Sequence, residues 1–282
     1  MTTENSPFAI VTDSTADIPI DTAESLNISV IPAVLTLDGE TYLDGLDISR
    51  AEFYQRMPDL RTPPTTAVPS VLVFEETYQR LFESGVERIL SIHLSSYLSG
   101  MVNTAKQAAH NFDDRVKVFD SSQLSLGVGF QAIEAAQSVM KGLVFDQVVS
   151  TAKRFRERAY VVALIDRLEF MRRSGRVTWL RANIGDFLQI KQLVEVKDGL
   201  VNALTRTRTY TKAFEQLISI ASTWKNIERL AVLHSGAPER AEELTEQVVG
   251  MCPNPLMIVD ITTTIGVHVG PGCVGLAVIT HD

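Results

Sequence analysis

The stretch "RILSIHLSSYLSGMVNTAKQAAHNF" at residues 88–112 decides the fold class, because a strand, a polar loop and a helix follow one another in it. Residues 88–94 form a mostly apolar run that predicts a buried strand, and residues 101–112 predict a helix. The loop between them, 95–100, contains three serines. The stretch therefore predicts a strand whose carboxyl end leads into a hydroxyl-rich loop.

The same order recurs through the first half of the chain. Apolar strand candidates lie at residues 8–12, 28–37 and 116–120, and Pro32 inside the second predicts a strand edge or a break. Helix candidates lie between and after them, at residues 51–57, 71–84, 126–142 and 146–159. Strand–helix alternation of this kind is typical of a mainly parallel sheet covered by helices. We therefore predict a Rossmann-like α/β domain over residues 1–157.

The second half shows strand pairs mixed among helices. Residues 189–209 predict two strands joined by an Asp-Gly turn at 198–199. Residues 265–280 place two apolar runs around a Gly-Pro-Gly turn, as in a tight hairpin. The remaining elements expected here are strands at 160–165, 229–236 and 256–261, helices at 168–176 and 239–250, and a further helix between the strand pair and residue 229. This pattern predicts an α+β domain with a mixed or antiparallel sheet over residues 158–282.

The composition is that of an ordinary soluble globular protein, with 45% apolar and 21% charged residues. A net charge of -8 argues against general nucleic-acid binding, which needs clustered Lys and Arg. The longest apolar runs are too short to span a bilayer, and the N-terminus lacks a signal-peptide pattern, so we expect no stable membrane insertion. Cys252 and Cys273 lack metal-ligand spacing and predict free thiols in a reducing compartment, hence a cytoplasmic location.

Hydroxyl side chains follow several of the predicted strands. They occur in "DSTAD" (13–17), "SSYLS" (95–99) and "DSSQLS" (120–125), and a further group, "TTAVPS" (65–70), opens a helix. Loops are normally polar, so any one of these segments is most simply a solvated turn. Because ligands of open α/β sheets sit beyond the carboxyl ends of the strands, the four segments together predict a cup of neutral donors suited to an anion.

A nucleophilic serine is the alternative interpretation of the same loops. A serine hydrolase or acyl transferase could use Ser95 or Ser96 with His268 and an acid such as Asp13 or Asp120. The segment "SSYLSG" is not a G-x-S-x-G elbow, because no glycine precedes the serine. His268 lies among glycines in "GVHVGPG", where a ligand or the backbone could approach closely, or where a hairpin carries an incidental histidine.

Other chemistries find little support in the sequence. His93 lies within a predicted strand and is expected to be a core histidine. No metal-ligand spacing and no phosphate-binding loop of the G-x-x-x-x-G-K-[ST] type occurs, so we expect neither a metal nor a nucleotide cofactor.

Seven segments of this chain resemble motifs of the DegV family of bacterial fatty-acid-binding proteins, in the family's order and from about residue 8 to residue 280. They are "IVTDSTADIP" (10–19), "PTTAVPS" (64–70), "LSSYLSG" (94–100), "FDSSQLSLGVG" (119–129), "LEFMRRSGRV" (168–177), "RTRTYTKA" (206–213) and "GVHVGPG" (266–272). The resemblance implies a two-domain α/β fold that holds one long-chain fatty acid between its domains. It also implies a protein that is not itself an enzyme, needs no cofactor, and presents the carboxyl group to a separate fatty acid kinase, which forms an acyl phosphate.

The resemblance also assigns residues. The carboxylate clamp and the two arginines at the carboxyl end and the kinase-facing surface fall on Thr65, Thr66, Ser95, Ser96, His268, Arg176 and Arg208. Two departures occur: Ala67-Val68 replaces the family's usual Ser-Gln, and Tyr97 replaces a glycine. The first removes an amide donor, and the second adds a ring near the predicted mouth.

The chemistry of these residue types agrees with that assignment. Thr and Ser hydroxyls can donate hydrogen bonds to a carboxylate held away from water without titrating themselves. Affinity would come mainly from the tail, at roughly 0.8 kcal/mol per buried methylene, so about fifteen carbons would gain on the order of 12 kcal/mol before ordering costs. A four-carbon acid would gain only about 3 kcal/mol on the same basis. The predicted site therefore favours long acids.

Overall fold

The computed structural model describes residues 7–177 and 190–281. Residues 1–6, which begin the segment that lacks a signal-peptide pattern, and residue 189, the first of the predicted strand pair, lie outside the described residues. None of the described helices is both long enough and apolar enough to cross a bilayer.

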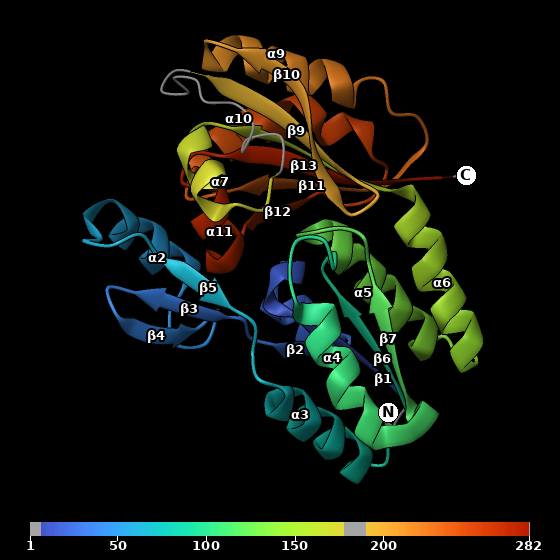
Figure 1. Cartoon of the computed structure of the whole chain (residues 1–282). Coiled ribbons are helices and arrows are strands. Elements are labelled where there is room, and N and C mark those ends of the chain that lie inside the picture. Colours follow the sequence, from blue (N-terminus) through green and yellow to red (C-terminus); the bar gives the residue numbers. More distant parts are fainter. Residues whose placement is uncertain (1–6, 178–189, 282) are drawn as a thin grey trace.

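A parallel sheet of four strands forms the base of the N-terminal half (Figure 1). Its order is β2-β1-β6-β7, and its strands are β1 (Phe8–Asp13), β2 (Ile28–Ile31), β6 (Arg88–His93) and β7 (Val116–Asp120). All three pairings are parallel, so the carboxyl ends of the strands meet at one edge, and the hydroxyl-rich loops gather there. The predicted mainly parallel sheet is confirmed.

Helices cover this sheet, and one of them also faces the second half of the chain. They are α1 (Ile20–Ser25), α3 (Val71–Glu83), α4 (Met101–Ala109), α5 (Leu126–Met140) and α6 (Phe145–Arg158). Helix α5 contacts β1 and β6 of the first sheet and β8 and β13 of the second. Because it lies between two sheets, it is buried on most of its surface, and its glycines and alanines allow close packing.

A small antiparallel sheet with the order β4-β3-β5 lies beside the first sheet (Figure 1). Its strands are β3 (Val34–Leu37), β4 (Glu40–Leu43) and β5 (Thr65–Ala67), and helix α2 (Arg50–Arg56) follows β4. The break expected at Pro32 is confirmed, since β2 ends before it and β3 begins after it. The segment leads into a helix as expected, and Ser70 occupies the N-cap position of α3, but Thr65 and Thr66 lie in β5, because this extended segment pairs with β3. The sequence pattern did not predict β4 or β5.

The second half contains a mixed sheet of six strands in the order β10-β9-β8-β13-β11-β12. The strands are β8 (Ala159–Ile165), β9 (Lys191–Lys197), β10 (Leu200–Thr207), β11 (Ile227–His234), β12 (Met257–Asp260) and β13 (Val274–Thr280). The helices are α7 (Leu168–Ser174), α9 (Tyr210–Ala221), α10 (Pro238–Val248) and α11 (Thr263–Val269). The predicted hairpin at Asp198-Gly199 is confirmed, and β11 with β12 is the parallel pair. The predicted α/β fold class, a parallel sheet followed by a mixed sheet, is therefore confirmed.

The expected hairpin at residues 265–280 is wrong. Its first apolar run is helix α11, and only the second run is a strand, β13. The Thr262 side chain accepts a hydrogen bond from the Ile265 N–H and caps the helix, and Gly270, with φ of 74°, ends it. The first run, residues 265–269, has only five residues, which are too few for hydrophobic periodicity to distinguish a helix from a strand.

One large hydrophobic core joins the two halves. It extends from Ile10 and Phe130 in the first half to Leu233 and Ala277 in the second. The second half adds its own core on the other face of its sheet. The division into domains at residues 157 and 158 stays a prediction.

Candidate ligand-binding site

A cavity of about 480 Å³ lies where the two halves meet, within the usual size range of small-molecule pockets. We call it the main cavity. Leu94 and Met101 contribute its wall on the side of the parallel sheet, and Met171 and Val201 contribute the wall on the side of the mixed sheet. Both halves of the chain are therefore needed to form it.

A second cavity of about 60 Å³, the inner cavity, continues the main cavity into the protein. The two share five lining residues, Leu124, Met171, Val201, Ile265 and Val269. Val161, Ala163 and Ile165 alternate along β8, and their side chains line the same face. Together the cavities form an apolar slot that runs from the mouth of the main cavity to the sheet.

Polar side chains gather at the outer end of this slot. Thr66 on β5 and His268 on α11 both line the main cavity, and Thr66 Oγ1 lies 3.1 Å from His268 Nε2. Ser96, in the loop after β6, lines the same cavity and is exposed, and so does Arg176 after α7. His268 Nδ1 is buried and has no hydrogen-bond partner among the described residues. The slot therefore ends in hydroxyls, an imidazole with unused hydrogen-bonding capacity and a nearby cation.

Burial determines the charge state of His268. Desolvation, followed by the positive charge of Arg176, lowers the pKa of His268 to about 4. The ring is therefore neutral at pH 7 and can use one nitrogen as donor and the other as acceptor. A carboxylate placed at this end would meet neutral donors and Arg176.

The structure brings four of the seven assigned residues to the main cavity: Thr66, Ser96, Arg176 and His268. The other three lie elsewhere. Thr65 is exposed and lines a separate outer cleft, which it shares with Thr66, Arg176 and His268. Arg208 is exposed after β10 and is absent from the described residues that line either cavity.

Ser95 lies behind the cavity wall. Its side chain is fully buried, and its Oγ donates a hydrogen bond to the Gly199 carbonyl at 2.7 Å. The same oxygen accepts from the Tyr97 N–H at 3.2 Å. Ser95 therefore holds the serine loop against the turn between β9 and β10, and the exposed ring of Tyr97 packs near that turn.

Two further threonines line the main cavity and were not assigned from the sequence. Thr15 belongs to the hydroxyl-rich turn after β1, and Thr264 belongs to the first turn of α11. Thr15 lies in a segment that the sequence had marked as polar. Thr264 is one of three consecutive threonines after β12, which is the same signal of hydroxyls at a strand end.

The arrangement expected of a serine hydrolase is not formed by the described residues. Asp120 accepts from the backbone N–H groups of Ser96 and Ser122, and neither it nor Asp13 is a hydrogen-bond partner of His268. His268 therefore lacks an orienting acid within the described part of the chain.

Asp13 is instead part of a different cluster. His93 Nδ1 lies 2.8 Å from Asp13 Oδ2, and His93 Nε2 lies 2.7 Å from Ser91 Oγ. This has the order of a catalytic triad, but all three side chains are 0% exposed, and Ser91 Oγ also lies 2.9 Å from Tyr78 Oη. The cluster joins β1, β6 and α3 inside the core, and His93 is a core histidine as expected. The described residues also contain no group of three His, Cys, Asp or Glu side chains that could hold a metal ion.

Comparisons with known proteins show which family this chain matches. The model of a family described as "Uncharacterised protein, DegV family" matches residues 7–281. A DegV domain-containing protein of Streptomyces coelicolor is 33% identical over 274 residues, which are 96% of this chain and 97% of that protein.

Two solved structures are similar over their whole length. A DegV family protein of Thermus thermophilus, whose structure is described as one of fatty acid binding, is 31% identical, with a TM-score of 0.89 over 97% of this chain and 99% of that one. DegV of Bacillus subtilis, described as a fatty acid binding protein, is 26% identical, with a TM-score of 0.85 over 97% and 99%. The family match covers nearly the whole chain and the structural match includes both sheets, so this protein belongs to the DegV family.

Proposed function

We propose that this protein binds one long-chain fatty acid, with the tail in the main and inner cavities and the carboxylate at Thr66, Ser96 and His268. The observation that carries the proposal is the apolar slot that ends at the Thr66–His268 pair. The similar proteins of Thermus thermophilus and Bacillus subtilis, both described as binding fatty acids, support it. Thr65, which lines the outer cleft, and Ser95, which is buried in the serine loop behind the cavity wall, are not proposed to contact the carboxylate.

The physical chemistry of the slot favours a long acid. Each methylene that leaves water contributes roughly 0.8 kcal/mol, so the tail supplies most of the affinity. Hydrogen bonds from the hydroxyls and the neutral imidazole replace those that the carboxylate loses when it leaves water. This matters because burying an anion without hydrogen-bond donors costs free energy. None of these groups is required to act as a base, so the acid is held unchanged.

Mass spectrometry of lipid extracted from gently purified protein tests the proposal. We expect one co-purifying long-chain fatty acid per chain, and a higher melting temperature when such an acid is added to stripped protein, because a ligand that binds only the folded state stabilises it. Thr66→Val and His268→Ala should weaken binding. Thr62→Val is the matched control, because that exposed hydroxyl bonds to Asp38 outside the cavity. Protein that emerges empty and ignores added fatty acids would contradict the proposal.

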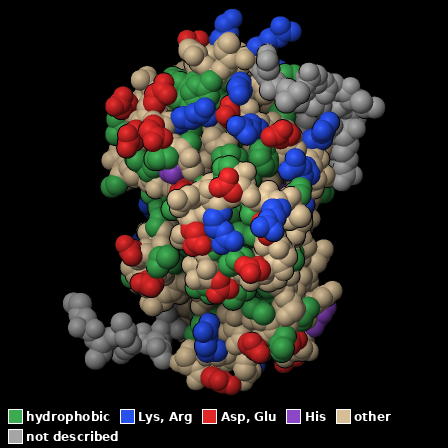
Figure 2. Space-filling model, turned by 90° about the vertical axis from the view of Figure 1, so that its left-hand side faces the viewer, with side chains coloured by type: hydrophobic (Ala, Val, Ile, Leu, Met, Phe, Trp, Pro, Cys, Tyr) green, Lys and Arg blue, Asp and Glu red, His purple; other side chains and the backbone are tan. Residues whose placement is uncertain are grey.

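We further propose that the bound acid is presented to a separate fatty acid kinase, which transfers the γ-phosphoryl group of ATP to the carboxylate and releases ADP and an acyl phosphate. The carboxyl end of the proposed site lies beside exposed Ser96 and Arg176, and Arg172 and Arg173 on α7 are also exposed. Figure 2 shows Lys and Arg side chains interspersed with Asp and Glu side chains over the upper and middle parts of this view, so the proposal depends on the individual arginines and not on a basic surface. Two buried free cysteines support a cytoplasmic location.

Arginine variants in a reconstituted kinase assay test the partnership. Arg176→Ala and Arg208→Ala should fold and should form less acyl phosphate per bound lipid; the rate is normalised to lipid content because Arg176 lines the cavity that would hold the carboxylate. Arg154→Ala is the control, because it removes an exposed arginine of α6, away from the mouth. Acyl-phosphate formation at the wild-type rate in both variants would refute the assignment of these arginines.

A further inference from the structure

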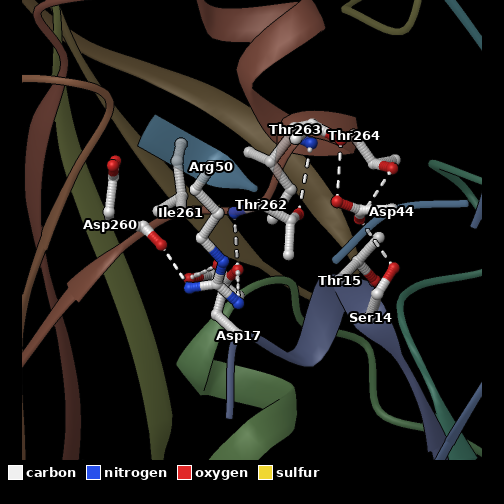
Figure 3. Close-up of polar contacts among 12 residues, drawn as sticks. Ser14, Thr15, Asp17, Asp44, Arg50, Asp260, Ile261, Thr262, Thr263 and Thr264 are labelled. Atoms are coloured by element: carbon white, nitrogen blue, oxygen red, sulfur yellow. Dashed lines mark hydrogen bonds and ion pairs between the residues drawn. The ribbon is translucent and has the colours of Figure 1, made fainter. Parts of the chain in front are cut away.

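A buried carboxylate that lines neither the main nor the inner cavity holds the start of helix α11 (Figure 3). Asp44, just after β4, is 3% exposed and accepts three hydroxyl hydrogen bonds. Ser14 Oγ donates at 2.7 Å, Thr263 Oγ1 at 2.7 Å and Thr264 Oγ1 at 3.0 Å. The donors come from the turn after β1 and from the first turn of α11. Asp44 therefore joins three segments that are far apart in the sequence.

A second buried carboxylate holds the residue before this helix. Asp17 is 0% exposed and accepts a hydrogen bond from the Thr262 N–H at 2.7 Å and another from Ser125 Oγ. An Arg50 nitrogen lies 3.6 Å from its Oδ1, and Arg50 also donates to the Asp260 carbonyl. Asp17 thus anchors the backbone at the point where α11 begins, whereas Asp44 holds two side chains of the helix itself. Because the Asp44 bonds are made by side chains of the helix itself, they act, together with its packing against α7, β3 and β5, on which face of the helix points toward the cavity.

The orientation of α11 decides where His268 lies. Thr264 and His268 are four residues apart, so they lie on the same face of the helix, one turn apart. Both line the main cavity. The hydrogen bond from Thr264 to Asp44 therefore holds the face from which His268 reaches Thr66.

We propose that Asp44 is a positioning residue for the head-group end of the site: through Thr263 and Thr264 it sets the place of His268 relative to Thr66. The inference rests on the proposed binding of a fatty acid, and it adds a residue that does not touch the ligand. A carboxylate suits this positioning role because hydrogen bonds to carboxylates are shorter and stronger than those between neutral groups. An asparagine at the same position has the same shape but cannot accept all three bonds with the same strength.

The first test compares an acid with an alcohol of the same chain length. Asp44→Asn should lower the affinity for hexadecanoic acid by about tenfold or more, the scale of a lost hydrogen bond to a charged group. The affinity for hexadecanol, which has no carboxylate to clamp, should stay close to the wild-type value. Asp47→Asn is the matched control, since exposed Asp47 lies in the same loop and accepts from the Leu43 N–H. Thr264→Val, which removes one donor and keeps the shape, should act in the same direction with a smaller effect.

A double-mutant cycle tests whether the effect of Asp44 on acid binding depends on His268. In a His268→Ala background, Asp44→Asn should leave the ratio of acid to alcohol affinity unchanged, because the group that it positions is absent. Two results would overturn the inference in favour of a general structural effect. One is an equal loss of acid and alcohol affinity in Asp44→Asn, and the other is a further decrease in the ratio of acid to alcohol affinity when Asp44→Asn is added to His268→Ala.

A ligand-free measurement separates this inference from the proposed function. The imidazole NMR signals of His268 should shift in Asp44→Asn and in Thr264→Val, and should stay in place in Asp47→Asn. Unmoved signals in both variants would overturn the positioning inference whether or not the protein binds lipid. Shifted signals in a protein that binds no fatty acid would instead refute the proposed function and leave the positioning inference standing.

Discussion

Filling the inner cavity from the protein side should shorten the fatty acid that this protein prefers. Ala163 is the residue to change, because it lies on β8 between Val161 and Ile165 and lines the inner cavity. Ala163→Leu places three additional carbons where the end of a long tail would lie. The polar end of the slot, formed by Thr66 and His268, is not touched.

The magnitude follows from the size of the cavity. Its volume is about 60 Å³, and a buried cavity costs about 24 cal/mol per Å³. A tail that fills it therefore gains roughly 1.4 kcal/mol, which is about a tenfold difference in affinity. At roughly 0.8 kcal/mol per methylene, this corresponds to about two methylenes. Long acids should therefore lose about tenfold in affinity for Ala163→Leu, while acids too short to reach the inner cavity should lose nothing.

Competition binding with a series of saturated acids, from decanoic to octadecanoic, measures this profile. Wild-type affinity should rise about fourfold per methylene until the tail reaches the end of the slot. In the variant the rise should stop about two methylenes earlier. Ala163→Val is a second variant in case leucine is too large for the site. Val162→Ile is the control, because Val162 lies in the core on the other face of the sheet.

Two results would refute the reasoning. An equal loss of affinity at every chain length would mean that the substitution disturbs the whole site. An unchanged profile in a folded Ala163→Leu protein would mean that tails do not enter the inner cavity.

Three further predictions concern stability. Burial raises the pKa of Asp17 from its ordinary 3.8 to about 7, so the folded chain keeps a proton that the unfolded chain has lost, and wild-type stability should fall by roughly 3 kcal/mol relative to Asp17→Asn as pH rises from 4 to 7. Denaturant titrations at several pH values measure this, and a pH-independent difference contradicts it. Burial, with Arg176, lowers the pKa of His268 from 6.5 to about 4, so the wild type should lose about 3 kcal/mol relative to His268→Gln as pH falls from 6.5 to 4; parallel pH profiles of the two proteins would disprove this. Gly199 has φ of +80°, and an added Cβ would lie 2.6 Å from Ser95 Oγ, so Gly199→Ala should destabilise the protein by about 1 kcal/mol or more, and an unchanged melting temperature would rule this out.

The proposed binding site shows that two adjacent residues of the same type can have different structural roles. Ser95 and Ser96 are adjacent in a loop, yet Ser96 lines the main cavity and Ser95 donates to the Gly199 carbonyl. Nothing in the local sequence separates them, because the partner of Ser95 lies 104 residues away. The same reason explains why Arg176 reaches the cavity and Arg208 lies elsewhere on the surface.

The sequence by itself determined the fold class of this protein and much, though not all, of its local structure. Strand–helix alternation, the Pro32 break and the Asp198-Gly199 turn are consequences of short-range backbone preferences, so they could be predicted from neighbouring residues. Hydroxyl-rich loops after the strands could also be assigned to one edge, because parallel strands end on the same side of a sheet.

Only the tertiary structure decided which of those hydroxyls face the slot. Helix α11 depends on contacts with β3, β5 and α7, and the bonds from its threonines to Asp44 join residues separated by 219 and 220 positions. Strand β5 likewise exists because it pairs with β3. The physical reason is that a buried hydrogen bond or an apolar wall needs partners from distant segments, and local preferences contain no information about where those segments meet.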